Sequence, residues 1–385
     1  MRAIERLGSE RGAVFVQVGI AAFVLMAFNV FVLDYGMVWI ARRQAQNAAD
    51  SGALAGAVAR SYDDFDDPPS GSGIVPRVAK KVASANLIWQ QPGTPVVSFD
   101  CPGGVTGRCV RVDVYRNGEN GSTPLPTIFG PVLGVTSQGV RATATAISAN
   151  GNATNCLRPF AFADGWTEAI TAGQFNKYVE TGPGAGNVLT PTHDDYGPGP
   201  GTTIAEFGQR IDFQFNRNLL TDAITHGFLV PLDLGGDFAT NITTCNGRTN
   251  AIGDVLPVAT GGEGALELPG VNAVLAQDPL ANWDAINNRV VNSCAPGCGP
   301  VSPRLIPIAL FNPDQYQHNR ATGIWTGCPG GTPCVTVSNI IGLFIHVGAT
   351  PNPHGHMVRY PGLTSTTAPT YNDNASWLTT TSLIR

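Results

Sequence analysis

The N-terminus contains an apolar stretch that a water-exposed fold does not readily accommodate. Ala13 to Leu33 reads AVFVQVGIAAFVLMAFNVFVL, and among these 21 residues only Gln17 and Asn29 are strongly polar. A helix of this length spans about 31 Å, close to the roughly 30 Å hydrocarbon core of a bilayer. Cleaved signal peptides have apolar regions of about 7–15 residues that end in small residues, whereas Asp34 follows this stretch. The sequence therefore predicts a retained transmembrane helix at residues 13–33, with the lipid bilayer as a partner.

Charges on either side of this span predict its orientation. Arg2, Arg6 and Arg11 precede it, and the first basic residues after it are Arg42 and Arg43. Because basic residues near a span favour the cytoplasmic side, we expect residues 1–12 to form a cytoplasmic N-terminus. All eight cysteines follow the span, and an even number of cysteines is typical of disulfides in an oxidising compartment. We therefore expect the chain from about residue 34 onward to be extracytoplasmic.

Short Gly/Pro loops separate three cysteine pairs, which are Cys101 and Cys109, Cys294 and Cys298, and Cys328 and Cys334. Each pair is near enough in sequence for a local disulfide, which would leave Cys156 and Cys245 for a long-range bond. Eight cysteines allow many other connectivities, so the pairing stays open at this level. The absence of C-x-x-C and of zinc-finger spacing to a histidine disfavours a cysteine metal site.

Low charge and many turn-forming residues characterise the rest of the chain. Charged residues make up 13%, against about 25% in an ordinary soluble domain. The 46 glycines and 29 prolines favour turns and irregular loops. The net charge is −5 and no Lys/Arg-rich run occurs, so we expect no nucleic-acid partner.

Residues 34–148 are expected to form a first extracytoplasmic region. Ala-rich residues without proline, 41–59, predict that the membrane helix continues to about residue 60. The small residues along it reflect either helix propensity or close packing against another helix or a sheet. An acidic linker at 61–75 and a second helix at 76–91 should follow, with strand-like runs at 96–101, 110–115, 127–133 and 140–147.

Residues 149–385 are expected to form a second, α+β or mainly β region with disulfides. Its expected strands are at 211–215, 228–232, 304–310, 335–337 and 340–347, with helices at 168–179 and 280–292 and a long Gly/Pro-rich loop at 181–203.

A residue pattern surrounds the apolar span. It comprises Arg11 and Gly12 before the span, Gln17 within it, Asp34-Tyr35-Gly36 after it, and then Arg42, Gln46, Ala49-Asp50 and Ala53-Leu54-Ala55. This pattern resembles the N-terminal module of Tad-type (Flp) pilus assembly proteins, namely the TadG-like proteins and the related TadE pseudopilins. The resemblance implies a bacterial protein of the inner membrane that helps to build or anchor an adhesive pilus. It also implies a pilin-like module of helices on an antiparallel sheet, followed by a mainly β periplasmic domain.

The second region also resembles the long periplasmic parts of TadG-like proteins, although more sparsely. The matching segments are Cys156–Phe160, Asp164–Trp166, Cys245, Ser302–Ile308 and Ile340–Ile345.

Two departures from the family pattern bear on function. Processed pseudopilins have a Glu at the fifth position after the cleavage-site Gly, where this chain has Gln17 after Gly12. An uncharged residue there argues against processing, so an uncleaved TadG-like anchor is favoured over a processed pseudopilin. The chain also lacks the Asp-x-Ser-x-Ser of the von Willebrand A domain that many TadG-like proteins carry, which gives no support for a metal-dependent adhesion site of that kind.

No catalytic motif stands out. The sequence contains no G-x-S-x-G, no H-E-x-x-H and no P-loop. His354 and His356 form a tight pair with His346 eight residues earlier on an expected strand. The pattern favours a Pro/Gly-rich surface loop that happens to hold two histidines, with a transition-metal site as the weaker alternative.

The sequence as a whole predicts a non-catalytic, membrane-anchored structural or assembly component of a Tad (Flp, type IVc) pilus. Its expected partners are the bilayer and other Tad machinery, that is pseudopilins and platform proteins, without a cofactor or a small-molecule substrate. The alternatives are a processed pseudopilin of the same system, and an envelope-binding protein or adhesin that reuses the anchor.

Overall fold

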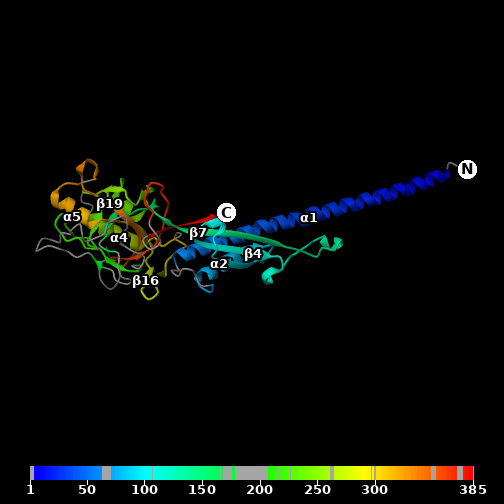
Figure 1. The fold of residues 1–385 in the computed structure, drawn as a ribbon, viewed down its shortest axis with the longest axis horizontal. Coiled ribbons are helices and arrows are strands. Elements are labelled where there is room, and N and C mark those ends of the chain that lie inside the picture. The colour runs from blue at the N-terminus through cyan, green and yellow to red at the C-terminus, as the bar shows by residue number, and fades with distance from the viewer. Residues whose placement is uncertain are drawn as a thin grey trace. The chain divides into compact units, whose positions relative to one another are not determined.

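The computed structural model describes residues 4–62, 71–105, 107–164, 166–167, 176–177, 207–215, 217–225, 227–260, 264–295, 297–298, 301–325, 327–347, 353–370 and 376–384. The chain divides into two compact units (Figure 1): unit 1 is Met1–Ala149 with Thr381–Arg385, and unit 2 is Asn150–Thr380. The second region, expected to run from 149 to 385, therefore ends at Thr380, because the last residues pack with unit 1. The acidic residues of the expected linker and the loop 181–203 lie outside the described residues.

Helix α1 runs without a break from Ile4 to Tyr62, 59 residues in all. Its first half is the apolar stretch, and its second half is a core element of unit 1. From Asp34 onward the buried residues recur at intervals of three and four, as in a helix with one buried face. The fully buried ones are small: Ala41, Ala45, Ala48, Ala49, Ala53 and Ala57, each 0% exposed.

These small residues let α1 lie close to helix α2 (Ile74–Ala85) and to the sheet behind it. A Cβ added at Gly52 would meet Ala83 Cβ at 2.9 Å, and one added at Gly56 would meet Val110 Cγ1 at 2.6 Å. The alanine- and glycine-rich sequence therefore reflects packing against both a helix and a sheet, as well as helix propensity.

The sheet of unit 1 contains strands β3 (Thr94–Ser98), β4 (Arg108–Arg116) and β7 (Val140–Gly151), which are antiparallel neighbours. Strand β22 (Leu378–Ile384) lies next to β7, and its last residues belong to unit 1. Side chains from β4 and β7, among them Val110 and Ala146, alternate toward the helices and form the core with the alanines of α1. The predicted helix-plus-antiparallel-sheet module is thus present (Figure 1).

One expected strand of unit 1 is wrong. The apolar run 127–133 forms a loop with a 3-10 helix, η3 (Gly130–Leu133). Pro131 has no backbone N–H to give to a ladder, and a Cβ at residue 130 would meet the carbonyl oxygen of Val135 at 2.4 Å. This Gly-Pro pair makes the run a turn despite its apolar character.

Unit 2 is built on one sheet in the order β12-β20-β19-β18-β9-β13, and β15 pairs with β19. Neighbours are antiparallel except β9 and β18, which are parallel. The strands are β9 (Phe160–Ala163), β12 (Arg210–Asp212), β13 (Leu229–Pro231), β15 (Val255–Pro257), β18 (Leu305–Phe311), β19 (Cys334–His346) and β20 (His354–Val358). Apolar clusters cover both faces of this sheet.

Strand β9 shows how the two faces differ. Its sequence is Phe-Ala-Phe-Ala, and successive side chains of a strand point to opposite faces. Phe160 and Phe162 pack with Ile242 of α3 (Phe238–Thr243) and Val271 of α4 (Gly264–Gln277). The two alanines face the cluster that contains Tyr316 of α5 (Pro313–Thr322). Unit 2 is therefore α+β, with a mainly β core.

A buried ion pair fixes α4 to the chain that follows β12. Arg217 donates from both terminal nitrogens to Glu267, at 2.5 and 2.7 Å, and the two side chains are 4% and 0% exposed. Burial raises the pKa of Glu267 above its usual value, although the hydrogen bonds and charge of Arg217 oppose that rise. Two parallel bonds of this kind hold the guanidinium in a defined orientation.

The expected helices of unit 2 are largely wrong. Residues 280–292 form a hairpin of β16 (Asn282–Asp284) and β17 (Arg289–Val291), since the Asp284 carboxylate accepts the Ile286 N–H and Asn288 is left-handed at φ 46°. Of the expected helix 168–179, the described part is β11 (Asn176–Lys177), paired with β10 (Trp166–Thr167). Helix α5 was not predicted from the sequence. Asn312-Pro313 was the signal for its start, since Asn caps helices and Pro suits their first turn.

The structure pairs the eight cysteines in four disulfides: Cys101–Cys109, Cys156–Cys245, Cys294–Cys298 and Cys328–Cys334. Three of them close short loops, and Cys156–Cys245 joins residues 89 positions apart. A cross-link over a long segment constrains the unfolded chain most, so this bond should contribute most to the stability of unit 2.

The remaining elements are short. They are β1 (Leu87–Ile88), β2 (Gln91–Pro92), β5 (Leu125–Pro126), β6 (Ser137–Gln138), β8 (Ala153–Thr154), β14 (Asn250–Ala251), β21 (Tyr360–Pro361), η1 (Pro102–Gly104), η2 (Glu119–Gly121) and η5 (Pro329–Gly331).

Candidate functional site

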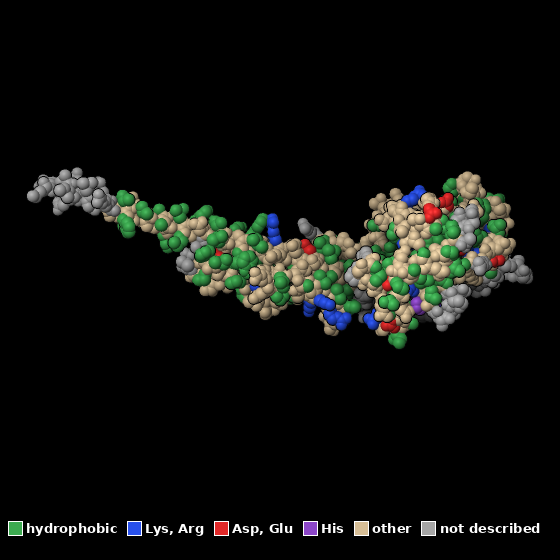
Figure 2. Space-filling model, turned by 180° about the vertical axis from the view of Figure 1, so that it is seen from behind, with side chains coloured by type: hydrophobic (Ala, Val, Ile, Leu, Met, Phe, Trp, Pro, Cys, Tyr) green, Lys and Arg blue, Asp and Glu red, His purple; other side chains and the backbone are tan. Residues whose placement is uncertain are grey.

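The apolar half of α1 exposes large hydrophobic side chains on every face. Phe15 is 81% exposed, and Phe23, Met26 and Phe31 are each exposed by more than 60%. Figure 2 shows hydrophobic side chains along this part of the helix with no acidic or basic group among the described residues. Water would strongly disfavour such a surface, whereas a lipid environment accepts it. This helix is a candidate membrane anchor, long and apolar enough to cross a bilayer.

Asp34 marks the point where protein begins to cover α1. Its carboxylate is 4% exposed and accepts the backbone N–H groups of Ile128 at 2.9 Å and Gly130 at 2.7 Å, with Phe129 N at 3.3 Å. The carboxylate thus binds three successive amides of the η3 loop, as an anion binds at a nest of N–H groups. The contact attaches the loop between β5 and β6 to the helix directly after the apolar stretch.

This contact also brings a second apolar surface to the end of the span. Ile128 is 57% exposed, Phe129 39% and Val135 44%, and these three form what we call the loop apex. The first turns of α1 after Asp34 also expose aromatic residues: Tyr35 is 60% exposed and Trp39 52%. Aromatic side chains are enriched where a span leaves the bilayer, so this surface has the composition of a membrane interface. The loop apex was not predicted from the sequence, although the apolar residues around Gly130-Pro131 could have indicated an exposed apolar loop there.

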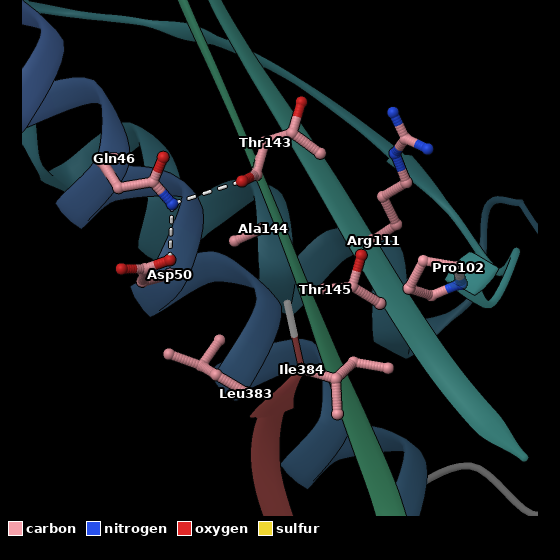
Figure 3. Close-up of a pocket in the computed structure, with 9 residues that line it drawn as sticks. All are labelled: Gln46, Asp50, Pro102, Arg111, Thr143, Ala144, Thr145, Leu383 and Ile384. Carbon is pink, nitrogen blue, oxygen red and sulfur yellow. Dashed lines mark hydrogen bonds between the residues drawn. The ribbon is translucent and has the colours of Figure 1, made fainter. Parts of the chain in front are cut away.

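Gln46 and Asp50 of the predicted motif connect α1 to the sheet. Gln46 Nε2 donates to Asp50 Oδ1 at 2.8 Å and to the carbonyl oxygen of Thr143 in β7 at 3.2 Å (Figure 3). They line an open groove of about 580 Å³ that Arg111 and Leu383 also border. The pair stabilises the helix–sheet contact, and the groove has no arrangement of acid, base and nucleophile among its lining residues.

Next to this groove, Asp113 is the centre of a charged network on the sheet. Burial would raise the pKa of Asp113, but hydrogen bonds from Thr143, Arg141 and Arg111 lower it below its usual value. Arg111 and Arg141 lie 3.1 and 3.0 Å from the carboxylate. The network joins β4 to β7 and leaves Asp113 ionised at neutral pH.

The other motif residues divide between exposed and buried positions. Gly12, Gln17 and Arg42 are exposed, whereas Ala49 and Ala53 are fully buried. Leu54 and Ala55 are partly buried, as is Gly36, and the side chain of Arg11 lies outside the described residues. The structure thus brings Gln46, Ala49, Asp50 and Ala53 into the contact between α1 and the rest of unit 1, and it joins Asp34 to the η3 loop. Gly12 and Gln17 remain on the exposed apolar half of the helix.

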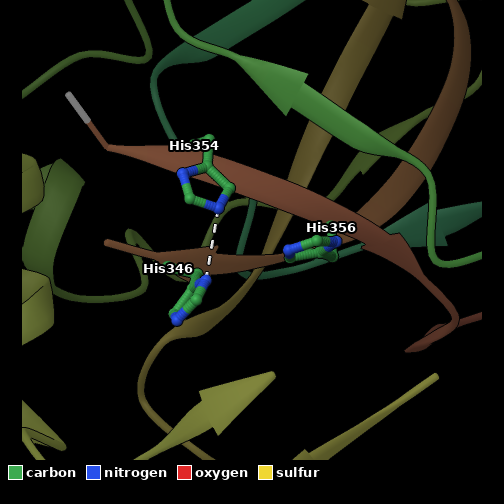
Figure 4. A group of neighbouring side chains, drawn as sticks. All are labelled: His346, His354 and His356. Atoms are coloured by element: carbon green, nitrogen blue, oxygen red, sulfur yellow. Dashed lines mark hydrogen bonds between the residues drawn. The ribbon is translucent and has the colours of Figure 1, made fainter. Parts of the chain in front are cut away.

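The three histidines are in unit 2 and lie together (Figure 4). His354 and His356 belong to the inner strand β20 and are 2% and 8% exposed, so the surface loop favoured for them is wrong. Both histidines are buried because β20 lies between β12 on one side and β19 on the other. Burial, together with the nearby His354 and His356, lowers the pKa of His346 to about 4. Burial likewise lowers the pKa of His356.

Comparison with known proteins identifies the N-terminal part of the chain. Residues 12–59 match the Tad family, described as "Putative Flp pilus-assembly TadE/G-like". This segment is TadE/G-like. The resemblance seen in the residues around the span is thereby confirmed for residues 12–59, which we call the Tad segment. This segment contains both the span and Asp34.

The match ends at residue 59, so the resemblance of the second region to TadG-like proteins stays a prediction. No curated protein and no solved structure matches the chain.

Replacing Asp34 by Ala should detach the η3 loop from the Tad segment. Three backbone N–H groups would lose their acceptor, at an expected cost of about 1–3 kcal/mol. Hydrogen–deuterium exchange of the detergent-solubilised chain should show faster exchange in peptides covering 127–135. Asn47→Ala, a change at an exposed position of the same helix, is the matched control and should leave exchange there unchanged. Equal protection of the loop in D34A and wild type would contradict the role given to Asp34.

Proposed function

We propose that this chain is a single-pass structural component of a bacterial Tad (Flp) pilus assembly system, anchored in the inner membrane by residues 13–33. The observation that carries the proposal is that α1 is one continuous helix. Its apolar first half is exposed, and from Asp34 onward the same helix packs in the core of unit 1. Because the helix has no break, the distance between the membrane span and unit 1 is fixed. Such a part suits an assembly role, in which a folded domain is held at a fixed height above the bilayer.

Two features support an extracytoplasmic position of both units. All eight cysteines are paired, and disulfides persist in oxidising compartments such as the periplasm. Three arginines precede the span, which favours a cytoplasmic N-terminus. The loop apex would then rest on the outer surface of the inner membrane.

The exposed side of α1 above the span is where we place contacts with other pilus components. Beyond the span, Tyr35, Trp39 and Arg43 follow one another at intervals of four, so they lie on one helix face. The Phe31 and Tyr35 rings stack at 5.7 Å, and the Arg43 guanidinium lies 3.8 Å from the Trp39 ring centroid. Aromatic and arginine side chains are enriched in protein interfaces, so pseudopilins or platform proteins are the partners we propose for this face.

Loss of this chain should abolish or strongly reduce surface pili in its own host. We expect a chromosomal deletion to remove pili seen by electron microscopy, and plasmid-borne wild type to restore them. Trp39→Ala with Arg43→Ala should restore fewer pili than Arg77→Ala at equal protein level, since Arg77 is exposed on α2 and lies outside the proposed contact face. A deletion strain with normal pili but weakened surface attachment would instead favour the adhesin alternative.

The mature N-terminus separates an uncleaved anchor from a processed pseudopilin. Intact-mass spectrometry of the membrane-extracted chain should show that residues 2–12 are retained, because Gln17 lacks the carboxylate of processed relatives. Gln17→Glu restores that carboxylate and is the matched variant for the same measurement. A wild-type chain that begins at Ala13 would contradict the uncleaved anchor and place the protein among the pseudopilins.

A further inference from the structure

The topology of unit 2 places three imidazoles on the same face of its sheet. His346 of β19 is directly opposite His354 of β20, and His356 is two residues further along β20. Directly paired residues share a face, and so do residues i and i+2 of one strand. The convergence therefore follows from strand register and does not depend on a loop conformation.

The distances between the rings are those of ligands around one small cation. His346 Nδ1 and His354 Nε2 are 3.2 Å apart. Two nitrogens at about 2.0–2.1 Å from a tetrahedral Zn²⁺ are separated by about 3.3 Å. One nitrogen from each of the three rings lies within 4.8 Å of the others.

Contacts around His356 orient it for such a role. Its Nδ1 lies 3.0 Å from the carbonyl oxygen of Gly208. Because a carbonyl only accepts, Nδ1 carries the proton and the lone pair is on Nε2. Trp283 stacks on the ring with centroids 4.6 Å apart and planes 9° from parallel. Metal-binding histidines commonly donate their second nitrogen to a carbonyl in this way, which sets the tautomer and the ring orientation.

The protonation of the cluster also suits a cation. His346 and His354 share a hydrogen bond that needs one proton between the two nitrogens, and a bound ion would take the place of that proton. The positive charges of Arg304 and Arg210 act on His346, and this repulsion lowers the affinity of the histidine cluster for a metal ion.

We propose that His346, His354 and His356 form a binding site for a divalent transition-metal ion, with Zn²⁺ the ion that best suits three imidazole ligands at this spacing. Three protein ligands leave a fourth position open to water or to a ligand from a partner, as in zinc sites that are not closed by four side chains. Figure 4 shows that the three rings converge from two adjacent strands. The site is independent of the pilus-assembly role and lies outside the Tad segment.

A second group of metal-ligating residues in unit 2 does not compete with this site. Asp278 lies near Cys294 and Cys298, but these two cysteines are bonded to each other. Asp278 accepts hydrogen bonds from Ser293, Ser302 and the Cys294 N–H. Its oxygens are therefore used within the fold, and no cysteine of the chain is free.

The test is a Zn²⁺ titration of the full-length, tag-free, oxidised chain in detergent after treatment with a chelator. Isothermal titration should give one Zn²⁺ per chain, and X-ray absorption of the zinc complex should show imidazole nitrogens at about 2.0 Å. His346→Gln, which removes one ligand at a half-buried position, should weaken binding at least about 100-fold. His318→Ala, an exposed histidine on α5, is the matched control and should bind as wild type does.

A thermal-unfolding scan keeps the result interpretable. H346Q should unfold near the wild-type temperature in chelator, whereas the rise in melting temperature on adding Zn²⁺ should occur in wild type and H318A alone. The proposal is overturned if wild type binds no stoichiometric Zn²⁺, if H346Q binds it as tightly, or if the absorption spectrum shows oxygen ligands only. Should H346Q fail to fold, the ligand set seen by X-ray absorption of wild type decides between these outcomes.

Discussion

Unit 1 depends on one contact, which joins the carboxylate of Asp34 on helix α1 to the backbone amides of the η3 loop. Asp34 is buried by the amides of residues 128–130, whereas Phe31, Val32 and Leu33 directly before it are exposed among the described residues. One helix therefore serves two environments. Before Asp34 it presents large apolar side chains in all directions, and after it a stripe of alanine and glycine faces α2 and the sheet. In the function proposed above, this change from large to small side chains corresponds to the change from a lipid-facing surface to a packed protein core.

Unit 2 is stabilised in a different manner. Its central sheet is covered on both faces, and its strands are accordingly almost continuously apolar, as in β18 and β19. Much of the connecting chain is irregular, and disulfides close several of its loops. Among the buried polar groups of this unit, Arg217 is paired with Glu267 and three histidines are clustered.

The sequence predicted the parts that rest on periodicity and failed where turn chemistry or pairing decided the outcome. The long helix, the second helix and the alternating strands β4 and β7 follow from patterns of 3.6 and 2 residues. The run 127–133 and the segment 280–292 were misassigned because Gly130-Pro131 and the Asp284 turn override the apolar pattern. Asp34 was recognised as a motif residue, but its partners are 94 to 96 residues away, and no local pattern predicts such a contact. The histidine cluster likewise depends on the register of β19 and β20, and the Pro/Gly-rich sequence between these strands does not predict that register.

The claim that α1 is one helix crossing from lipid into protein at Asp34 can be measured directly. Single spin labels at successive positions from 14 to 50, in the chain reconstituted in nanodiscs, report collisions with oxygen and with a water-soluble nickel complex. The account predicts oxygen-rich, nickel-poor sites at 14–33 without helical periodicity, and from 37 onward a period near 3.6 residues that follows the buried alanines. Periodic protection within 14–33, or nickel accessibility throughout it, would contradict a single lipid-facing span.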